Sequence, residues 1–360
     1  ILLQEWSQEQ GLFGPIRNIY HGTAKGLTEA PHISKRHDYY YLTTAEGGTG
    51  YDHAVTLSRS RDIWGPYEDH PDLYVMTVDD PAHPVQRTGH GQYVEGHDGA
   101  HWHTFLMGRP LLVDGKPYCQ MGRETGIARV EWRDDWLYLE DGGQKPPEYV
   151  QGPMRTPSSS VVHKNFTSLP DEFQWLRTPE PDRIFRVEHG QLILIGRESI
   201  GSWFEQSLVA RRQEHHAYDA ATTVDFQPET YQHGAGLITY YNRHKFHGAF
   251  VTDYDGQRVL TLMSCNGDWS EGAIEVIGAW PVPDGPIRLS VQVRGAVQQF
   301  FHDDLPLGPP RDAYLISDEG GRGEHASFTG AFVGMMAFDL TGQGQEATFT
   351  RFEYAPKGEM

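Results

Sequence analysis

The sequence predicts an all-β protein with two domains. Its 360 residues suffice for two hydrophobic cores. Short segments of alternating apolar and polar residues recur along the chain, whereas helical periodicity is scarce. The 40 glycines, 23 prolines and 12% aromatic residues favour many turns and half-buried strands. Short strands at this spacing are typical of a β-propeller, a β-sandwich or a β-barrel.

The first part of the chain is expected to form antiparallel strand pairs. Each pair consists of two apolar-patterned segments separated by a short polar or glycine-containing turn. The pairs are 39–44 with 53–60, 92–95 with 102–107, and 130–132 with 136–139.

The composition becomes rich in Pro, Gly and Ser over residues 141–160, which indicates a domain boundary. We therefore predict a first domain over 1–145, a linker over 146–165 and an antiparallel β-sandwich, jelly-roll-like, over 166–360. Strand pairs resume after the boundary. They are 184–187 with 192–195, 250–254 with 258–263, and 288–293 with 297–301.

Composition also excludes several classes of protein. A formal net charge of −19 argues against nucleic acid as a partner, because the phosphates would be repelled. No run approaches the roughly 18 apolar residues of a membrane helix. Cys119 and Cys265 form no disulfide framework or zinc motif, which is compatible with a reducing cytoplasm.

Glu29 is the first candidate site residue. It stands in "LTEAPHI", where Pro31 restricts the backbone and biases Ala30 toward an extended conformation. A catalytic acid needs rigid placement, but a Glu in a turn is more often simply solvated. The residues alone leave both interpretations open.

Three other segments carry polar groups suited to a small ligand. The loop 46–50, "EGGTG", offers the Thr49 hydroxyl but lacks the Lys and helix of a phosphate-binding loop. His90, His97, His101 and His103 crowd into one hairpin, and an exposed hairpin is favoured over a metal site for His97, His101 and His103. Arg109 ends a strand between Gly and Pro, where it can aim a bidentate donor into a cavity.

Taken together, these motifs resemble glycoside hydrolase family 43, in its bacterial β-xylosidase branch. They are "LTEAPHI", "YYYLTTAEGGTGYDHAVTLSRS", "GPYEDHP", "GHGQYV", "GRP" and "GRETGIARVEW", in this order. The second half adds "SLVARRQ", "GAGLITYYN" and "FTGAFVGMMAFDLTG". The resemblance implies a five-bladed β-propeller, of which this chain carries the C-terminal part, followed by a β-sandwich.

The resemblance also implies an activity and roles for residues. It implies an inverting exo-β-1,4-xylosidase that releases xylose from xylo-oligosaccharides, with α-L-arabinofuranosidase or dual activity as an alternative. Glu29 matches the general acid, and Thr49, Arg109 and Phe328 match residues of the sugar pocket. His90 matches a central His that binds substrate and, in some members, helps to hold a divalent cation such as calcium. No cofactor is otherwise implied, and a homo-oligomer is expected.

The sequence departs from the family pattern in three ways. Ala30 replaces the usual Gly, which should shift the loop little, and "GHGQ" replaces "GHAS" around His90. The general-base Asp and the Asp that tunes the acid have no counterpart before Glu29, and Asp38 and Asp52 do not lie in the base motif. We therefore expect a separate N-terminal chain of the same enzyme as a partner. The competing hypothesis is an inactive fragment that binds carbohydrate through sandwich aromatics such as Trp203, Tyr240 and Trp269.

Overall fold

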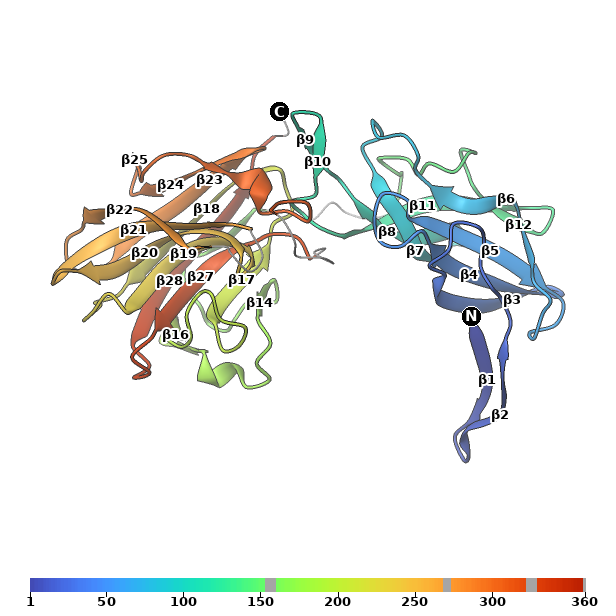
Figure 1. Cartoon of the computed structure of the whole chain (residues 1–360), viewed down its shortest axis with the longest axis horizontal. Coiled ribbons are helices and arrows are strands. Elements are labelled where there is room, and N and C mark those ends of the chain that lie inside the picture. The colour runs from blue at the N-terminus through green and yellow to red at the C-terminus, as the bar shows by residue number, and fades with distance from the viewer. Residues whose placement is uncertain (153–159, 268–272, 322–328, 359–360) are drawn as a thin grey trace. The chain divides into compact units, whose positions relative to one another are not determined.

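The computed structural model describes residues 1–152, 160–267, 273–321 and 329–358. Nearly all of its regular structure is β-strand, as predicted (Figure 1). The described residues contain no α-helix, only the 3₁₀ turns η1 (Pro181–Arg183) and η2 (Ala313–Leu315). None of these described segments is a helix that could span a membrane. The chain divides into two compact units: unit 1 holds 1–110 and 123–154, and unit 2 holds 111–122 and 155–360.

Unit 1 contains one hairpin and two four-stranded antiparallel sheets, which are the blades of the predicted partial propeller (Figure 1). The hairpin is β1 (Leu2–Ser7) with β2 (Gly11–Asn18). The first sheet has the order β3 (Glu29–Arg36), β4 (Tyr39–Glu46), β5 (Ala54–Ser60), β6 (Glu68–Thr77). The second has the order β12 (Trp136–Leu139), β11 (Glu124–Arg133), β8 (His101–Gly108), β7 (Gln86–Glu95).

The core of unit 1 lies between these two sheets. Strand β4 is buried along its last six residues, because it is an inner strand covered on both faces. Its Tyr41 packs edge-on against Trp132 of β11, with ring centroids 4.7 Å apart. The same cluster includes Val55, Phe105 and Leu137. The three strand pairs predicted for this part of the chain are all confirmed.

Unit 2 is a sandwich of a nine-stranded and a seven-stranded antiparallel sheet, with a separate two-stranded hairpin. The nine-stranded sheet comprises β13 (Val161–His163), β15 (Phe185–Glu188), β16 (Gln191–Ile195), β18 (Ala217–Asp225), β23 (Ile287–Arg294), β24 (Val297–His302), β25 (Leu305–Pro306), β26 (Arg311–Asp312) and β28 (Glu346–Pro356). The seven-stranded sheet comprises β14 (Phe173–Trp175), β17 (Ser207–Arg212), β19 (His233–Asn242), β20 (Lys245–Tyr254), β21 (Gln257–Asn266), β22 (Glu275–Pro281) and β27 (Phe332–Asp339).

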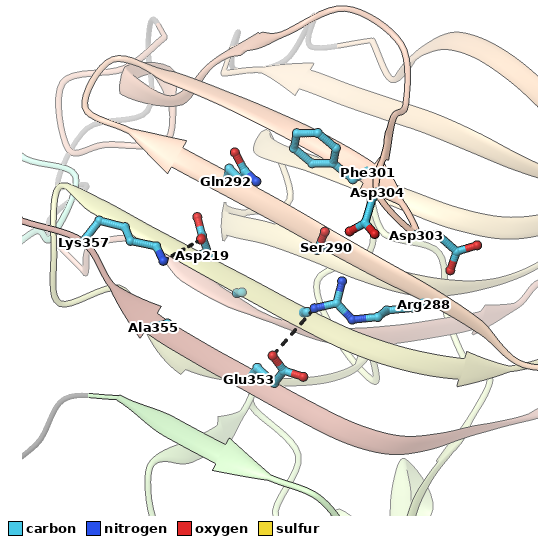
Figure 2. A pocket seen from close by; sticks show the side chains of 12 residues that line it. Asp219, Arg288, Ser290, Gln292, Phe301, Asp303, Asp304, Glu353, Ala355 and Lys357 are labelled. Atoms are coloured by element: carbon cyan, nitrogen blue, oxygen red, sulfur yellow. Dashed lines mark ion pairs between the residues drawn. The ribbon is translucent and has the colours of Figure 1, made fainter.

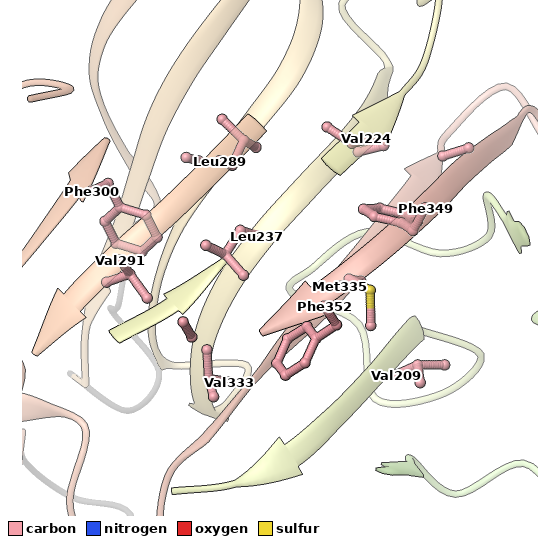
Figure 3. Packing of buried hydrophobic residues seen from close by; sticks show 14 of the residues in the cluster. Val209, Val224, Leu237, Leu289, Val291, Phe300, Val333, Met335, Phe349 and Phe352 are labelled. Atoms are coloured by element: carbon pink, nitrogen blue, oxygen red, sulfur yellow. The ribbon is translucent and has the colours of Figure 1, made fainter. Parts of the chain in front are cut away.

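Alternating side chains of the two sheets fill the sandwich core (Figure 3). Strand β23 shows the pattern: Leu289 and Val291 are fully buried, whereas Arg288 and Ser290 face outward. The three strand pairs predicted for this half are also confirmed.

Two segments lie differently from the expected domain boundaries. The hairpin β9 (Leu111–Val113) and β10 (Lys116–Tyr118) interrupts the second sheet of unit 1 but belongs to unit 2. Strand β13 lies within the expected linker yet pairs with β28 of the sandwich. Neither segment has an amphipathic pattern long enough to show which core it joins, because each strand has only three residues.

Candidate active site

One edge of the two sheets of unit 1 collects the candidate residues. Because neighbouring strands are antiparallel, the starts of β3 and β5 meet the end of β4: Glu29 pairs with Ala45, and Glu46 pairs with Ala54. In the second sheet, the end of β8 meets the starts of β7 and β11, as Gln86 pairs with Gly108. The two edges are joined where the His53 ring Nδ1 lies 3.2 Å from the Arg87 carbonyl oxygen.

Glu29 is the first residue of β3 and is exposed to solvent. A β-bulge separates its pairing from that of His32, and Pro31 sits within this bulge. Ala30 has φ of 52°, which is left-handed rather than the extended conformation expected before a proline. The bulge is the physical reason for the difference, since it turns the backbone at this point.

Glu46, at the end of β4, is fully buried and anchors the loop that precedes Glu29. The Thr23 amide donates to Oε1 at 2.7 Å, and the Thr28 hydroxyl donates to Oε1 at 3.0 Å. The Thr23 hydroxyl donates to Oε2. These bonds compensate the carboxylate for its loss of hydration.

Thr49 and His53 place polar atoms at the same edge. Thr49 Oγ1 and His53 Nε2 are buried, and neither finds a hydrogen-bond partner among the described residues. Burial lowers the pKa of His53 to about 4, so the ring is neutral at pH 7. Its Nδ1–H then donates to the Arg87 carbonyl oxygen, which leaves Nε2 as a hydrogen-bond acceptor.

His90 lies in β7 within the register shift between Gly89 and Gln92, is exposed, and has φ of 47°. The described residues include no group of three or more His, Cys, Asp or Glu side chains that could hold a metal ion. Calcium binding at His90 stays a prediction from the resemblance, and no further protein ligand is assigned to it among these residues.

Two other histidines of this hairpin, His101 and His103, have structural partners. His103 is almost fully buried, unlike the exposed hairpin residue expected, and its Nδ1–H donates to the Thr104 carbonyl oxygen at 2.7 Å. His101 Nδ1 lies 2.7 Å from the Tyr93 hydroxyl.

Arg109 follows the end of β8 and binds Glu124, the first residue of β11. Its Nε lies 3.1 Å from Oε2 and its NH2 lies 2.8 Å from Oε1. This two-point contact fixes the plane of the guanidinium group. Both side chains remain partly exposed, so the pair can meet a ligand from solvent.

Five aromatic residues of the second half of the chain remain, and three of them lie in the described part of the sandwich. Phe328 and Trp269 lie outside the described residues. Phe332 packs against a core cluster of the sandwich. Tyr240 is buried and donates to Gln206 at 2.9 Å, whereas Trp203 lies beneath the Arg243 guanidinium at 3.9 Å. Tyr240 therefore offers no open ring face for stacking on a sugar.

A hollow of about 430 Å³ lies on the outer face of the nine-stranded sheet (Figure 2). Four of its charged side chains are paired within the hollow: Lys357 Nζ lies 3.0 Å from Asp219, and Arg288 lies 3.6 Å from Glu353. Such pairing is typical of a solvated sheet face.

Sequence reasoning missed Glu46, His53 and Glu124 as members of this edge. Glu46 opens the "EGGTG" loop and so had a signal, but only Thr49 of that loop was singled out as a candidate. His53 directly precedes β5, and Glu124 is the first residue of β11; both lie next to a candidate segment. Because neighbouring strands are antiparallel, the direction of each strand would have placed these residues at the same edge of the sheets as the candidates.

Comparisons with known proteins agree with this architecture. Residues 1–137 match the family "Glycosyl hydrolases family 43", and residues 164–355 match "Beta xylosidase C-terminal Concanavalin A-like domain". "Xylosidase/arabinosidase 43B" of Humicola insolens is 47% identical over 99% of this chain and 69% of its own length. A "Putative beta-xylosidase" of Escherichia coli K12 is 36% identical over 99% of this chain and 71% of its own length.

A solved structure shows the same fold. The xylan β-1,4-xylosidase of Bacillus halodurans C-125 superposes with a TM-score of 0.88 at 36% identity, over 98% of this chain and 70% of that chain. Each of these relatives carries both matched regions in a single chain, so the comparisons give no support to the expected separate N-terminal partner. The identity, the coverage and both domain matches place this chain in glycoside hydrolase family 43, as a glycosidase with a Concanavalin A-like sandwich as its second domain.

Proposed function

We propose that the protein is an exo-β-1,4-xylosidase that releases xylose from the ends of xylo-oligosaccharides with inversion, and that Glu29 is its general acid. The names of the relatives support the substrate class. The observation that carries the role of Glu29 is its place: it is a solvent-accessible carboxyl group on a bulged strand start, at the edge where Thr49, His53 and Arg109 also lie.

In this proposal Glu29 gives its proton to the departing glycosidic oxygen while water attacks the anomeric carbon from the opposite face. Arg109, held in plane by Glu124, donates to sugar hydroxyls. Thr49, His90 and Phe328 are the other substrate-binding residues proposed.

Inversion also needs a second carboxylate, roughly 6.5–9.5 Å from the acid, to activate the water. We assign this general base to neither Asp38 nor Asp52. Asp38 lies 3.5 Å from Arg61 on the surface, with its side chain 84% exposed, so it lacks the enclosed setting that a water-activating base requires.

The test compares Glu29→Gln with the parent enzyme at full length on two aryl β-xylosides. With a poor leaving group, kcat/KM should fall by about 10²-fold or more, because protonation is then needed. With an activated leaving group such as 4-nitrophenolate, which departs without a proton, the loss should be much smaller. Equal losses on both substrates contradict the role of general acid.

The stereochemistry is tested separately by proton NMR during early turnover. Inversion of a β-xyloside releases α-xylose first, whereas retention releases β-xylose. Early accumulation of β-xylose overturns the inverting mechanism.

Activity on arabinofuranosides is a second candidate function, favoured by the name of the relative that is 47% identical. Parallel kinetics on 4-nitrophenyl β-D-xyloside and α-L-arabinofuranoside give the ratio of the two kcat/KM values. Activity on the arabinoside alone contradicts the primary proposal.

A further inference from the structure

We propose that Glu46 is a positioning residue, whose buried carboxylate holds the loop 22–28 and thereby fixes the place of Glu29. This inference rests on the proposed role of Glu29 as the acid. No part of the family comparison assigns a role to Glu46. The inference is based on two observations: the hydrogen bonds to the Glu46 carboxylate and the backbone conformation of the loop.

The loop leading to Glu29 is not fixed by a sheet ladder. Residues 21–28 form no strand or helix, and three of them have left-handed backbone: Gly22, Gly26 and Leu27, with φ of 83°, 73° and 54°. Left-handed backbone at Leu27 is unfavourable for a residue with a side chain, so other contacts must hold this conformation.

Glu46 supplies those contacts. Within the described part of the chain, every hydrogen bond to its carboxylate comes from this loop, through Thr23 and Thr28. The Thr28 hydroxyl bond spans 3.0 Å, and Thr28 is the residue directly before Glu29. A carboxylate buried this deeply is costly unless its oxygens are satisfied, so carboxylate and loop stabilise each other.

The packing around the carboxylate leaves little freedom. A Cβ atom at Gly22 would lie 1.8 Å from Thr28 Oγ1 and 2.7 Å from Glu46 Oε1, so only glycine permits this approach. The Gly47 amide, next to Glu46, also donates to the Gly26 carbonyl oxygen at 2.9 Å. The loop is thus attached to the end of β4 at both its start and its end.

This attachment matters because proton transfer depends on position. The acid must lie within hydrogen-bond reach of the leaving oxygen, and a displacement of about 1 Å can lower the rate by about 10²-fold. A loop released from Glu46 would keep Glu29 present but misplaced. The defect should therefore appear in the step that needs the proton.

Thr28→Val and Thr28→Ser form the matched pair for the test. Valine keeps the shape of threonine and removes the hydroxyl, whereas serine keeps the hydroxyl. With a poor leaving group, Thr28→Val should lower kcat/KM by about 10-fold to 100-fold, with little change on 4-nitrophenyl β-xyloside. Thr28→Ser should restore most of the loss. Glu46→Gln should show the same substrate dependence to a smaller degree, because its amide keeps one acceptor oxygen but replaces the other carboxylate oxygen with a donor.

Combining Thr28→Val with Glu29→Gln in one protein separates this inference from the proposed function on which it rests. If Glu46 acts through Glu29, Thr28→Val should add little once Glu29 is replaced. If Glu29→Gln alone affects both substrates equally, the acid assignment fails. If Glu29→Gln shows the leaving-group dependence but Thr28→Val loses nothing, or loses equally on both substrates, the positioning role is overturned. Thermal unfolding of each variant shows whether it folds. If Glu46→Gln does not fold, the comparison of Thr28→Val with Thr28→Ser tests the positioning role.

Discussion

At the scale of single residues, Arg109 and Glu124 show how a functional side chain is held in place. Arg109 stands directly after β8, where a long side chain is otherwise free to rotate, and the two bonds to Glu124 define its plane. Lysine would keep the charge but present a single ammonium group instead of a planar fork.

We therefore expect Arg109→Lys to raise KM for xylo-oligosaccharides by about 10-fold, which corresponds to about 1.4 kcal/mol of binding, with a smaller effect on kcat. Steady-state kinetics measure both values. The matched control is Arg133→Lys, because Arg133 pairs with Glu131 on the surface of the same unit with half of its side chain exposed. An unchanged KM in Arg109→Lys would remove Arg109 from the sugar site.

Ala30 illustrates what residue-level reasoning cannot supply. The rule for residues before proline predicted an extended backbone, but the bulge imposes φ of 52°. The glycine usual in the family at this position has a conformational reason, since glycine adopts this backbone without strain. The shape of a bulge depends on pairing with β4, which no local pattern encodes.

At the scale of elements, the segment Cys119–Gly122 shows how backbone packing holds the β9–β10 hairpin in unit 2. The Cys119 amide donates to Glu319 at 2.6 Å, and the Ala331 amide donates to the Gln120 carbonyl oxygen at 2.7 Å. Gly122 then passes so close to Gly330 that a Cβ atom at Gly122 would lie 2.2 Å from the Gly330 nitrogen.

Gly122→Ala should therefore destabilise unit 2 by several kcal/mol, because the new methyl group must displace the backbone of Gly330. Gly115→Ala is a close control: Gly115 also has left-handed backbone, with φ of 74°, but its Cβ position is open. That variant should lose only about 1 kcal/mol. Chemical denaturation measures both, and equal losses would show that the contact with Gly330 carries no stability.

The strands themselves were largely predictable, whereas their grouping was not. Alternation in 288–293 predicted β23 because one face of that strand lies in a core. The hairpin β9–β10 was assigned to the first domain because it lies between residues of that domain in sequence. In the candidate site, Glu29 and Arg109 were found through the family motifs, but Glu46 emerged only from its contacts with Thr23 and Thr28. Contacts distant in sequence leave no local signature.

At the scale of the whole molecule, both units bury neutral histidines. Burial lowers the pKa of His53 and His103 in unit 1, and of His247 in unit 2, to about 4 from an ordinary 6.5. Each unfolded state takes up a proton near pH 6.5, whereas each folded site resists protonation until about pH 4. The stability these sites contribute is therefore complete above pH 6.5 and is lost as the pH falls toward 4.

We expect the thermal unfolding midpoints of both units to decrease steeply between pH 6.5 and pH 4. Each buried histidine contributes at most about 3.5 kcal/mol to this decrease, because lowering its pKa from 6.5 to about 4 is worth about 1.4 kcal/mol per pH unit. Calorimetry across this range, with hydrogen exchange to assign each transition to its unit, makes the measurement.

His103→Gln should flatten the slope for unit 1 alone, because Gln binds no proton, although it lowers stability at pH 7. His37→Gln is the control, since the His37 side chain is 65% exposed and its removal should leave the slope unchanged. A flat profile between pH 6.5 and 4 would mean that these rings are hydrated or protonated in the folded protein.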